Sequence, residues 1–312
     1  MASVGSILGG AFRLLRERPG AVAIWAVTYC IGSLILSFGI TAAMFGTLMP
    51  TAADAGGAAA LSVWAGPLAS LVLFLYLCLL FLVVVLMNAV FRAMLRPHEG
   101  GFAYIRLGVD EFRMFGLVLL AYLAAFVASF VGWLIVLLLS AVIGFALGQS
   151  AVTAIVAFVL FLAFFCTLVW AHVRLSLIFP LSFHRRRITI DGAWELTRGR
   201  FWLLFACYFI IGLVLVLATG IVLTLAMGDY FAALAAANGD PDQIRIAGEA
   251  FAAQQLAMPL ATKILFGVVG AVFFAAGLAL GPGLLASATR ELLGDESEAA
   301  VFAAESDGSV VD

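Results

Sequence analysis

Charged side chains are scarce in this sequence. Only 11% of its 312 residues are Asp, Glu, Lys or Arg, and 65% are hydrophobic, whereas an ordinary soluble domain has about 25% charged residues. Between Arg113 and Arg174, none of the sixty positions 114–173 is charged. Because a helix needs only about 20 apolar residues to span a bilayer, this stretch holds two spans, joined by the break Gly148-Gln149-Ser150. The sequence therefore predicts a polytopic helical membrane protein.

Paired cysteines and metal-binding patterns are also missing. The four cysteines, Cys30, Cys78, Cys166 and Cys207, lie in apolar stretches without paired spacing, which predicts buried thiols and no disulfide. No His-Glu-x-x-His helix occurs, and the three histidines lack the spacing of a zinc site. We therefore expect no metal site, no cofactor and no catalytic residues, and the net charge of −2 gives no indication of nucleic-acid binding.

Six apolar runs predict six transmembrane helices, at about 21–47, 65–92, 114–147, 151–183, 201–227 and 260–289. Each is long enough to span, and no run alternates with the period of a barrel strand. If the six runs cross the membrane in turn, 14 of the 16 basic residues lie on the same side of it as the N-terminus. The positive-inside rule places that side, and both termini, in the cytoplasm.

These runs define a single all-α membrane domain over residues 1–293. The external segment 228–259 is predicted to form two short amphipathic helices, divided at Gly239-Asp240-Pro241. The tail 294–312 is acidic and rich in small residues, which predicts a disordered cytoplasmic tail. All 18 acidic residues lie outside the predicted spans, whereas ion-coupled transporters usually keep a carboxylate inside the membrane.

Similar segments precede the odd-numbered runs. Residues 11–18 and 193–200 share the pattern Ala, aromatic, charged, Leu, any, Arg, any, Arg, and residues 108–115 are a weaker copy. They predict interfacial helices and a threefold repeat of one such helix with a two-span hairpin, around a pseudo-threefold axis. The apolar residues expected in the headgroup zone are Ile7, Leu8, Phe12 and Leu15 in the first copy, and Ile190, Trp194 and Thr197 in the other.

The fourth and fifth runs carry a resemblance to a bacterial group. The stretch Arg174-Leu-Ser-Leu-Ile-Phe-Pro180, followed by Ile190-Asp-Gly-Ala-Trp-Glu-Leu-Thr-Arg-Gly-Arg-Phe-Trp202, is similar to the signature of six-span proteins. These include YciC-like inner-membrane proteins and the membrane domain attached to some glycerophosphodiester phosphodiesterases. The resemblance covers essentially the whole chain and implies a bacterial inner-membrane protein that supports membrane-associated enzymes or transport. The phosphodiesterase barrel of about 250 residues is missing, so catalysis does not carry over.

His172 and Arg174 are the deepest polar pair, about ten residues inside the fourth run. Either Arg174 snorkels to the headgroups while His172 bonds a carbonyl or Asn88, or the pair contacts a lipid phosphate or another anion. An arginine at the centre of a membrane-spanning helix raises the free energy of membrane insertion by about 2.5–3.5 kcal/mol. The other candidate anion or lipid contacts are Arg185, Arg186, Arg187, Arg198 and Arg200.

Gly281-Pro282-Gly283 predicts a helix break in the last run. The glycine-x-x-x-glycine spacings Gly144–Gly148 and Gly277–Gly281 indicate helix packing, whereas a broken helix can line a transporter site. The sequence thus favours a non-enzymatic inner-membrane protein that organises lipids, anionic at the cytoplasmic face, or a membrane protein partner. The alternative is a transporter or flippase-like carrier of a lipid or small amphiphile.

Overall fold

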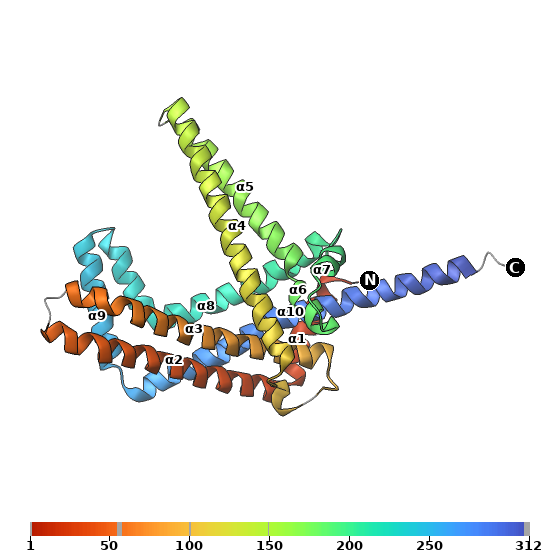
Figure 1. Ribbon diagram of the computed structural model, residues 1–312, viewed down its shortest axis with the longest axis horizontal. Coiled ribbons are helices and arrows are strands. Elements are labelled where there is room, and N and C mark those ends of the chain that lie inside the picture. The colour runs from red at the N-terminus through yellow and green to blue at the C-terminus, as the bar shows by residue number, and fades with distance from the viewer. Residues whose placement is uncertain (1, 55–57, 100, 149, 309–312) are drawn as a thin grey trace. The chain divides into compact units, whose positions relative to one another are not determined.

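The computed structural model describes residues 2–54, 58–99, 101–148 and 150–308, and throughout these ranges the regular secondary structure is helical (Figure 1). The elements in chain order are α1 (Val4–Glu17), α2 (Pro19–Asp54), α3 (Ala58–Leu95), the short 3-10 helix η1 (Phe102–Tyr104), α4 (Val109–Leu147), α5 (Ala151–Leu175), α6 (Ile178–Arg185), α7 (Ile190–Leu196), α8 (Phe201–Ala237), α9 (Pro241–Ala257) and α10 (Leu260–Gly308).

Six segments are long and apolar enough to cross a membrane, and they match the six predicted runs in number and order. Because only backbone that satisfies its own hydrogen bonds can span hydrocarbon, their helical form agrees with their composition. The protein is therefore an all-α, multi-pass membrane protein. The segments are Pro19–Thr41, Ala69–Leu95, Phe102–Ala146, Ala151–Arg185, Phe201–Ala237 and Leu260–Gly294.

The fourth predicted run is two helices rather than one. α5 ends at Leu175, and α6 begins at Ile178 with Pro180 in its first turn. A proline ring clashes with the carbonyl four residues earlier in a helix, here that of Ser176, which favours the break observed between α5 and α6. Arg174 therefore lies in the last turn of α5, while the span that contains it extends through α6 to Arg185.

The segment predicted to be external contains the two expected helices. α8 continues past a non-helical Met227 (φ −136°, ψ 15°) and ends at Ala237. A turn follows at Gly239, whose φ of 87° is in the left-handed region that glycine tolerates. The Asp240 carboxylate then accepts a bond from the Asp242 amide at 2.9 Å and caps α9.

α10 corrects two predictions. It is one helix from Leu260 to Gly308, and Pro282 lies inside it, so the predicted break at Gly281, Pro282 and Gly283 is wrong. A proline removes only one helical donor, and neighbouring groups in a membrane bundle can compensate for it. The tail predicted to be disordered from 294 is helical as far as Gly308, because its alanines and glutamates are strong helix formers. Residues 309–312 lie outside the described residues.

The chain divides into two compact units. Unit 1 consists of Met1–Leu14, Val83–Cys207 and Pro282–Asp312, and unit 2 of Leu15–Leu82 and Tyr208–Gly281. Each unit combines segments that are far apart in the sequence, and the boundaries between units fall inside α1, α3, α8 and α10. The single domain over 1–293 and the pseudo-threefold axis stay predictions.

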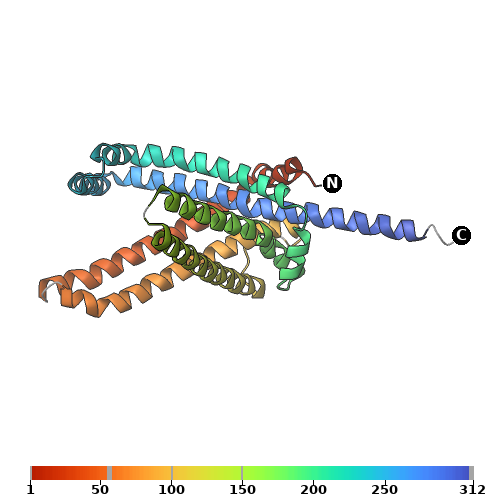
Figure 2. The same ribbon diagram turned by 90° about the horizontal axis from the view of Figure 1, so that it is seen from above.

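In unit 2, α2 and α3 run side by side as a hairpin (Figures 1 and 2). Two glycines of α2 permit the close approach: a Cβ on Gly32 would lie 2.2 Å from a methyl of Leu82, and one on Gly39 would lie 3.1 Å from Leu75. Elsewhere in this unit Trp25 is fully buried.

In unit 1, α1 packs against α10 through one face. Ile7, Ala11 and Leu14 are buried, and a Cβ on Gly10 would lie 2.0 Å from Oγ and 2.9 Å from Cβ of Ser287. The prediction that Ile7 lies in the headgroup zone is therefore wrong, because this face packs on protein, whereas Phe12 is 44% exposed.

α4 and α5 form a second antiparallel hairpin (Figures 1 and 2). They approach closely at Gly132, where a Cβ would lie 2.2 Å from the Phe164 ring. The predicted close approach at Gly144 and Gly148 is not formed: Gly144 makes an ordinary contact, and Gly148 (φ 69°) ends α4 with open space around it. Ser150 caps α5 by accepting a bond from the Thr153 amide. The break predicted between the third and fourth runs is confirmed on either side of residue 149.

The packing of α1 yields a stability prediction. Gly10→Ala is expected to lower the free energy of unfolding by about 1–3 kcal/mol, because overpacking forces helix α1 away from Ser287. Gly9→Ala is the matched control: Gly9 is exposed with nothing near its Cβ position, so alanine should stabilise the helix by up to about 1 kcal/mol. Thermal unfolding in detergent measures both, and equal melting temperatures for the two variants would contradict the docking of α1.

Candidate functional site

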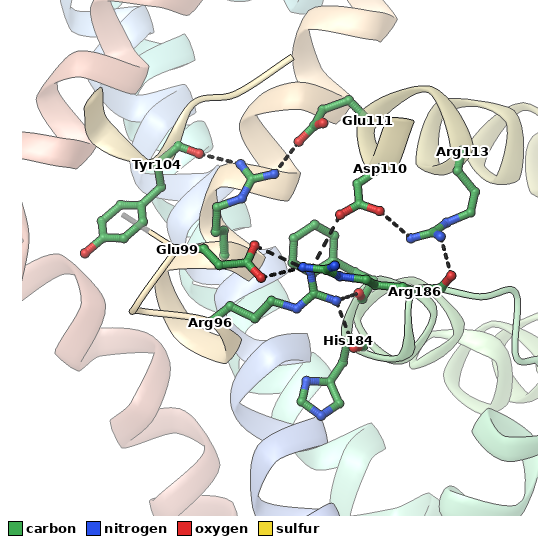
Figure 3. Close-up of polar contacts among 10 residues, drawn as sticks. Arg96, Glu99, Tyr104, Asp110, Glu111, Arg113, His184 and Arg186 are labelled. Atoms are coloured by element: carbon green, nitrogen blue, oxygen red, sulfur yellow. Dashed lines mark hydrogen bonds and ion pairs between the residues drawn. The ribbon is translucent and has the colours of Figure 1, made fainter. Parts of the chain in front are cut away.

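Seven charged residues of unit 1 form a network, which we call the arginine–carboxylate clamp (Figure 3). It joins the end of α3, the connector to α4, the first turn of α4 and the end of α6. We call this part of the molecule the basic end. The clamp residues are Arg92, Arg96, Glu99, Asp110, Glu111, Arg113 and Arg186.

Arg92 and Glu111 are the buried centre of the clamp. Their side chains are only 3% and 1% exposed, and Arg92 Nη2 lies 2.5 Å from Glu111 Oε1. The other terminal nitrogen of Arg92 donates to the carbonyl oxygen of Tyr104 at 2.6 Å. A buried charge is tolerated only when it is paired and hydrogen-bonded, so this arginine holds the end of α3, the connector and α4 together.

Arg96 connects the clamp to α6. Its Nη2 donates to the carbonyls of Phe183 at 2.6 Å and His184 at 2.9 Å, which are carbonyls of the last turn of α6, where cations are favoured. Its Nη1 lies 3.6 Å from a carboxylate oxygen of Glu99 and of Asp110. The guanidinium carbon is 4.8 Å from the centroid of the Phe183 ring, a cation–π distance.

Arg113 and Arg186 complete the clamp. Arg113 donates to Asp110 at 2.8 Å and to the backbone carbonyl of Arg186. Arg186 has a left-handed backbone (φ 52°), and its guanidinium donates to Glu99 at 2.7 Å. The clamp thus contains four arginines and three carboxylates, and every arginine in it has a carboxylate partner. Its arrangement serves to position helices and leaves little uncompensated charge.

Arg174 has a different environment. Its guanidinium carbon lies 4.8 Å from the ring centroid of Trp194 and 5.6 Å from that of Trp170, and the two rings meet edge to face at 5.5 Å. Its Nη1 makes only long contacts, 3.4 Å to the Trp194 carbonyl and 3.5 Å to Thr197 Oγ1. Its Nε is buried without a hydrogen-bond partner. We call Arg174, Trp170, Trp194 and Thr197 the tryptophan cradle.

The structure separates His172 from Arg174. They are two residues apart on α5, with the buried Val173 between them, and His172 is exposed while Arg174 is half-buried. The hydrogen bond predicted between His172 and Asn88 is not formed, because Asn88 is fully buried and both of its side-chain polar atoms lack a partner. The predicted polar pair is therefore not one site.

The remaining predicted arginines lie around α6 and α7. Arg185, Arg187 and Arg198 are exposed, and Arg200 is half-buried. Arg185 Nη1 would lie 2.8 Å from a Cβ on Gly192, so its guanidinium rests on α7. Arg186 belongs to the clamp. On α7, Ile190 and Trp194 are exposed, as a helix in the headgroup zone requires, but Thr197 is fully buried, so its predicted exposure is wrong.

Sequence reasoning missed the clamp. The segment around Asp110 and Glu111 was interpreted as a third interfacial helix, but it is the first turn of α4. Acidic residues are favourable there because they lie at the positive end of the helix dipole. The signal available was the occurrence of these carboxylates directly before a span, close to the arginines that end the preceding one.

Among the described residues, no group of three or more His, Cys, Asp and Glu side chains is arranged to hold a metal ion. Comparisons with family models, with curated proteins and with solved structures found no match to this chain. The resemblance to six-span bacterial proteins therefore stays a prediction.

The buried pair predicts a large effect of removing one charge. Glu111→Gln leaves Arg92 buried without a counter-charge, which is expected to lower the free energy of unfolding by about 3–5 kcal/mol. Glu249→Gln removes the carboxylate of an exposed ion pair, in which the side chains of Arg245 and Glu249 are 60% and 65% exposed. This substitution should change the free energy of unfolding by less than about 1 kcal/mol. Unfolding titrations compare the two variants; similar losses would contradict the central role of Glu111.

Proposed function

We propose that this protein is a non-enzymatic membrane protein that organises anionic lipid at its basic end, with the tryptophan cradle as the headgroup contact. One observation carries the proposal. Within the described ranges, no carboxylate forms an ion pair with Arg174, whereas each arginine of the clamp has one. Arg174 is thus a half-buried cation that lacks a counter-charge from the protein.

An anionic phosphate would supply that counter-charge. Arginine presents donors in a planar fork that matches phosphate oxygens, and a charge-assisted bond of this kind is about twice as strong as a neutral one. The two tryptophan faces hold the guanidinium without satisfying its donors, because a ring attracts a cation through its quadrupole alone. The cradle therefore positions Arg174 while leaving hydrogen-bonding capacity for a ligand.

The surroundings of the cradle suit the headgroup zone of a bilayer. Trp170, Trp194 and Trp202 are 41%, 39% and 76% exposed, and tryptophans gather at membrane interfaces. The exposed arginines Arg185 and Arg187 flank the same helices. Each basic residue near an anionic surface contributes about 1 kcal/mol of attraction.

The further parts of the proposal rest on the sequence. The excess of basic residues at this end favours a cytoplasmic location for it, and the resemblance favours a bacterial inner membrane. A membrane protein partner bound at the same end is an outcome that the experiment below can detect. The carrier alternative relied on His172, Arg174 and a broken last helix; α10 is continuous through Pro282, and no specific observation favours this alternative over the first.

The test is native mass spectrometry of the protein released from membranes that contain phosphatidylglycerol. The parent chain should retain this lipid, and Arg174→Gln should weaken its retention at least about tenfold, because a charge-assisted hydrogen bond contributes about 1.5–3 kcal/mol. Arg174→Lys should fall between them, since lysine lacks the planar fork. Arg245→Gln is the control, because Arg245 already has the carboxylate partner Glu249.

Three results would contradict the proposal. Arg174→Gln could retain the lipid as the parent does, or Arg245→Gln could lose it equally. A stoichiometric protein partner without specific lipid would replace the lipid role by a scaffold role. Competition with inorganic phosphate separates the ligand sources: displacement of the lipid at millimolar phosphate would indicate a site for the free anion.

A further inference from the structure

The connector between α3 and α4 exposes large apolar side chains. Phe102 is 77% exposed and Leu107 is 73% exposed, and in the first turn of α4 Val109 is 82% and Phe112 is 65% exposed. We call these four residues the connector surface. They lie at the basic end, beside the clamp rather than the tryptophan cradle, and a connector in water would be expected to be polar.

This surface is held in one conformation at an energetic cost. Ala103 and Tyr104 both have left-handed backbones, with φ of 49° and 61°. For residues other than glycine such a conformation is unfavourable and persists only where the surroundings fix it. The fixing contacts are the Arg92 bond to the Tyr104 carbonyl at 2.6 Å and the Ile105 amide bond to the Phe102 carbonyl at 3.0 Å.

Arg92 therefore supports both segments that carry the connector surface, the turn at Phe102 and the first turn of α4. Its second nitrogen pairs with Glu111 at 2.5 Å, which lies between Val109 and Phe112 on α4. The clamp thus fixes the turn that carries Phe102 and also the helix turn that carries the other apolar side chains. A flexible loop would instead be free to fold these side chains away from water.

The connector surface is continuous with the lipid-facing side of α4. Positions three and four apart share one face of a helix, and from Val109 and Phe112 this face continues along the span. Its further members are also exposed: Leu120 56%, Leu123 59%, Val127 50% and Phe130 56%. One apolar stripe thus begins in the connector and extends into the membrane-spanning part.

We infer that the connector surface is a preformed contact for the bilayer itself, lying at the boundary between the lipid headgroups and the acyl chains. Its occupant is a phospholipid surface, because the exposed apolar residues of the connector lead into the exposed apolar face of a membrane-spanning helix, with the side-chain-free Gly116 between Phe112 and Leu120. The inference is independent of the tryptophan cradle: either could fail without the other.

Spin labels on the same connector test it. The four cysteines are replaced by alanine, and a nitroxide label is placed at Leu107→Cys or, as the matched control, at the exposed His98→Cys. The protein is reconstituted into vesicles of phosphatidylethanolamine and phosphatidylglycerol. Collision with oxygen, which concentrates in lipid, is compared with collision with a water-soluble nickel chelate. We expect the ratio of oxygen to nickel collisions to be several-fold higher at position 107 than at position 98.

Two outcomes would overturn the inference. If the label at 107 is as accessible to the nickel chelate as the label at 98, the surface faces water and is open to a soluble partner. If it is protected from both reagents, another protein or a second copy covers it. A label at Phe102→Cys repeats the measurement in the strained turn, and adding Glu111→Gln should reduce its oxygen-to-nickel ratio, because the turn then loses its support.

Discussion

The buried ion pair between Arg92 and Glu111 is the interaction on which the basic end depends. It joins residues 19 positions apart, at the end of α3 and the start of α4, and both side chains are almost fully buried. Such a pair costs desolvation free energy and is retained only when its remaining groups are hydrogen-bonded. Arg92 meets this condition at both terminal nitrogens, which bond the Tyr104 carbonyl and Glu111, whereas its buried Nε has no hydrogen-bond partner; the Phe183 ring lies 5.6 Å from its guanidinium carbon. The connector and α4 therefore take their positions from Arg92, and Arg96 adds α6 through the Phe183 and His184 carbonyls.

Charge compensation divides the arginines of unit 1 into two kinds. Those of the clamp have carboxylates and carbonyls around them, so their function is to hold helices in place. Arg174 is surrounded by two tryptophan rings and two long contacts, and no carboxylate of the described residues pairs with it. The difference in partners separates the arginines that hold helices in place from the one proposed to bind lipid. The lipid role is proposed for Arg174 rather than for Arg185 and Arg187 because those two are exposed, whereas Arg174 is half-buried beside two tryptophan rings.

The sequence predicted the helices because the hydrocarbon core imposes a strong and simple requirement on length and polarity. It also predicted the turn around 148–150 and the division near Gly239. The end of α5 was missed because a hydropathy pattern does not register the clash of Pro180 with the Ser176 carbonyl. The break at Pro282 was overpredicted for the opposite reason, since a membrane helix can tolerate one lost donor. The clamp depends on pairs such as Glu99 with Arg186, whose proximity arises only from the packing of separate helices.

The most direct test of the account is an experimental structure of the protein in phosphatidylglycerol nanodiscs, with a bound antibody fragment to aid image alignment. The account predicts a lipid phosphate within hydrogen-bond distance of the Arg174 guanidinium, between Trp170 and Trp194, and no lipid phosphate on the buried Arg92. A guanidinium at position 174 that pairs with a carboxylate, or whose donors face only protein with no phosphate near them, would contradict it.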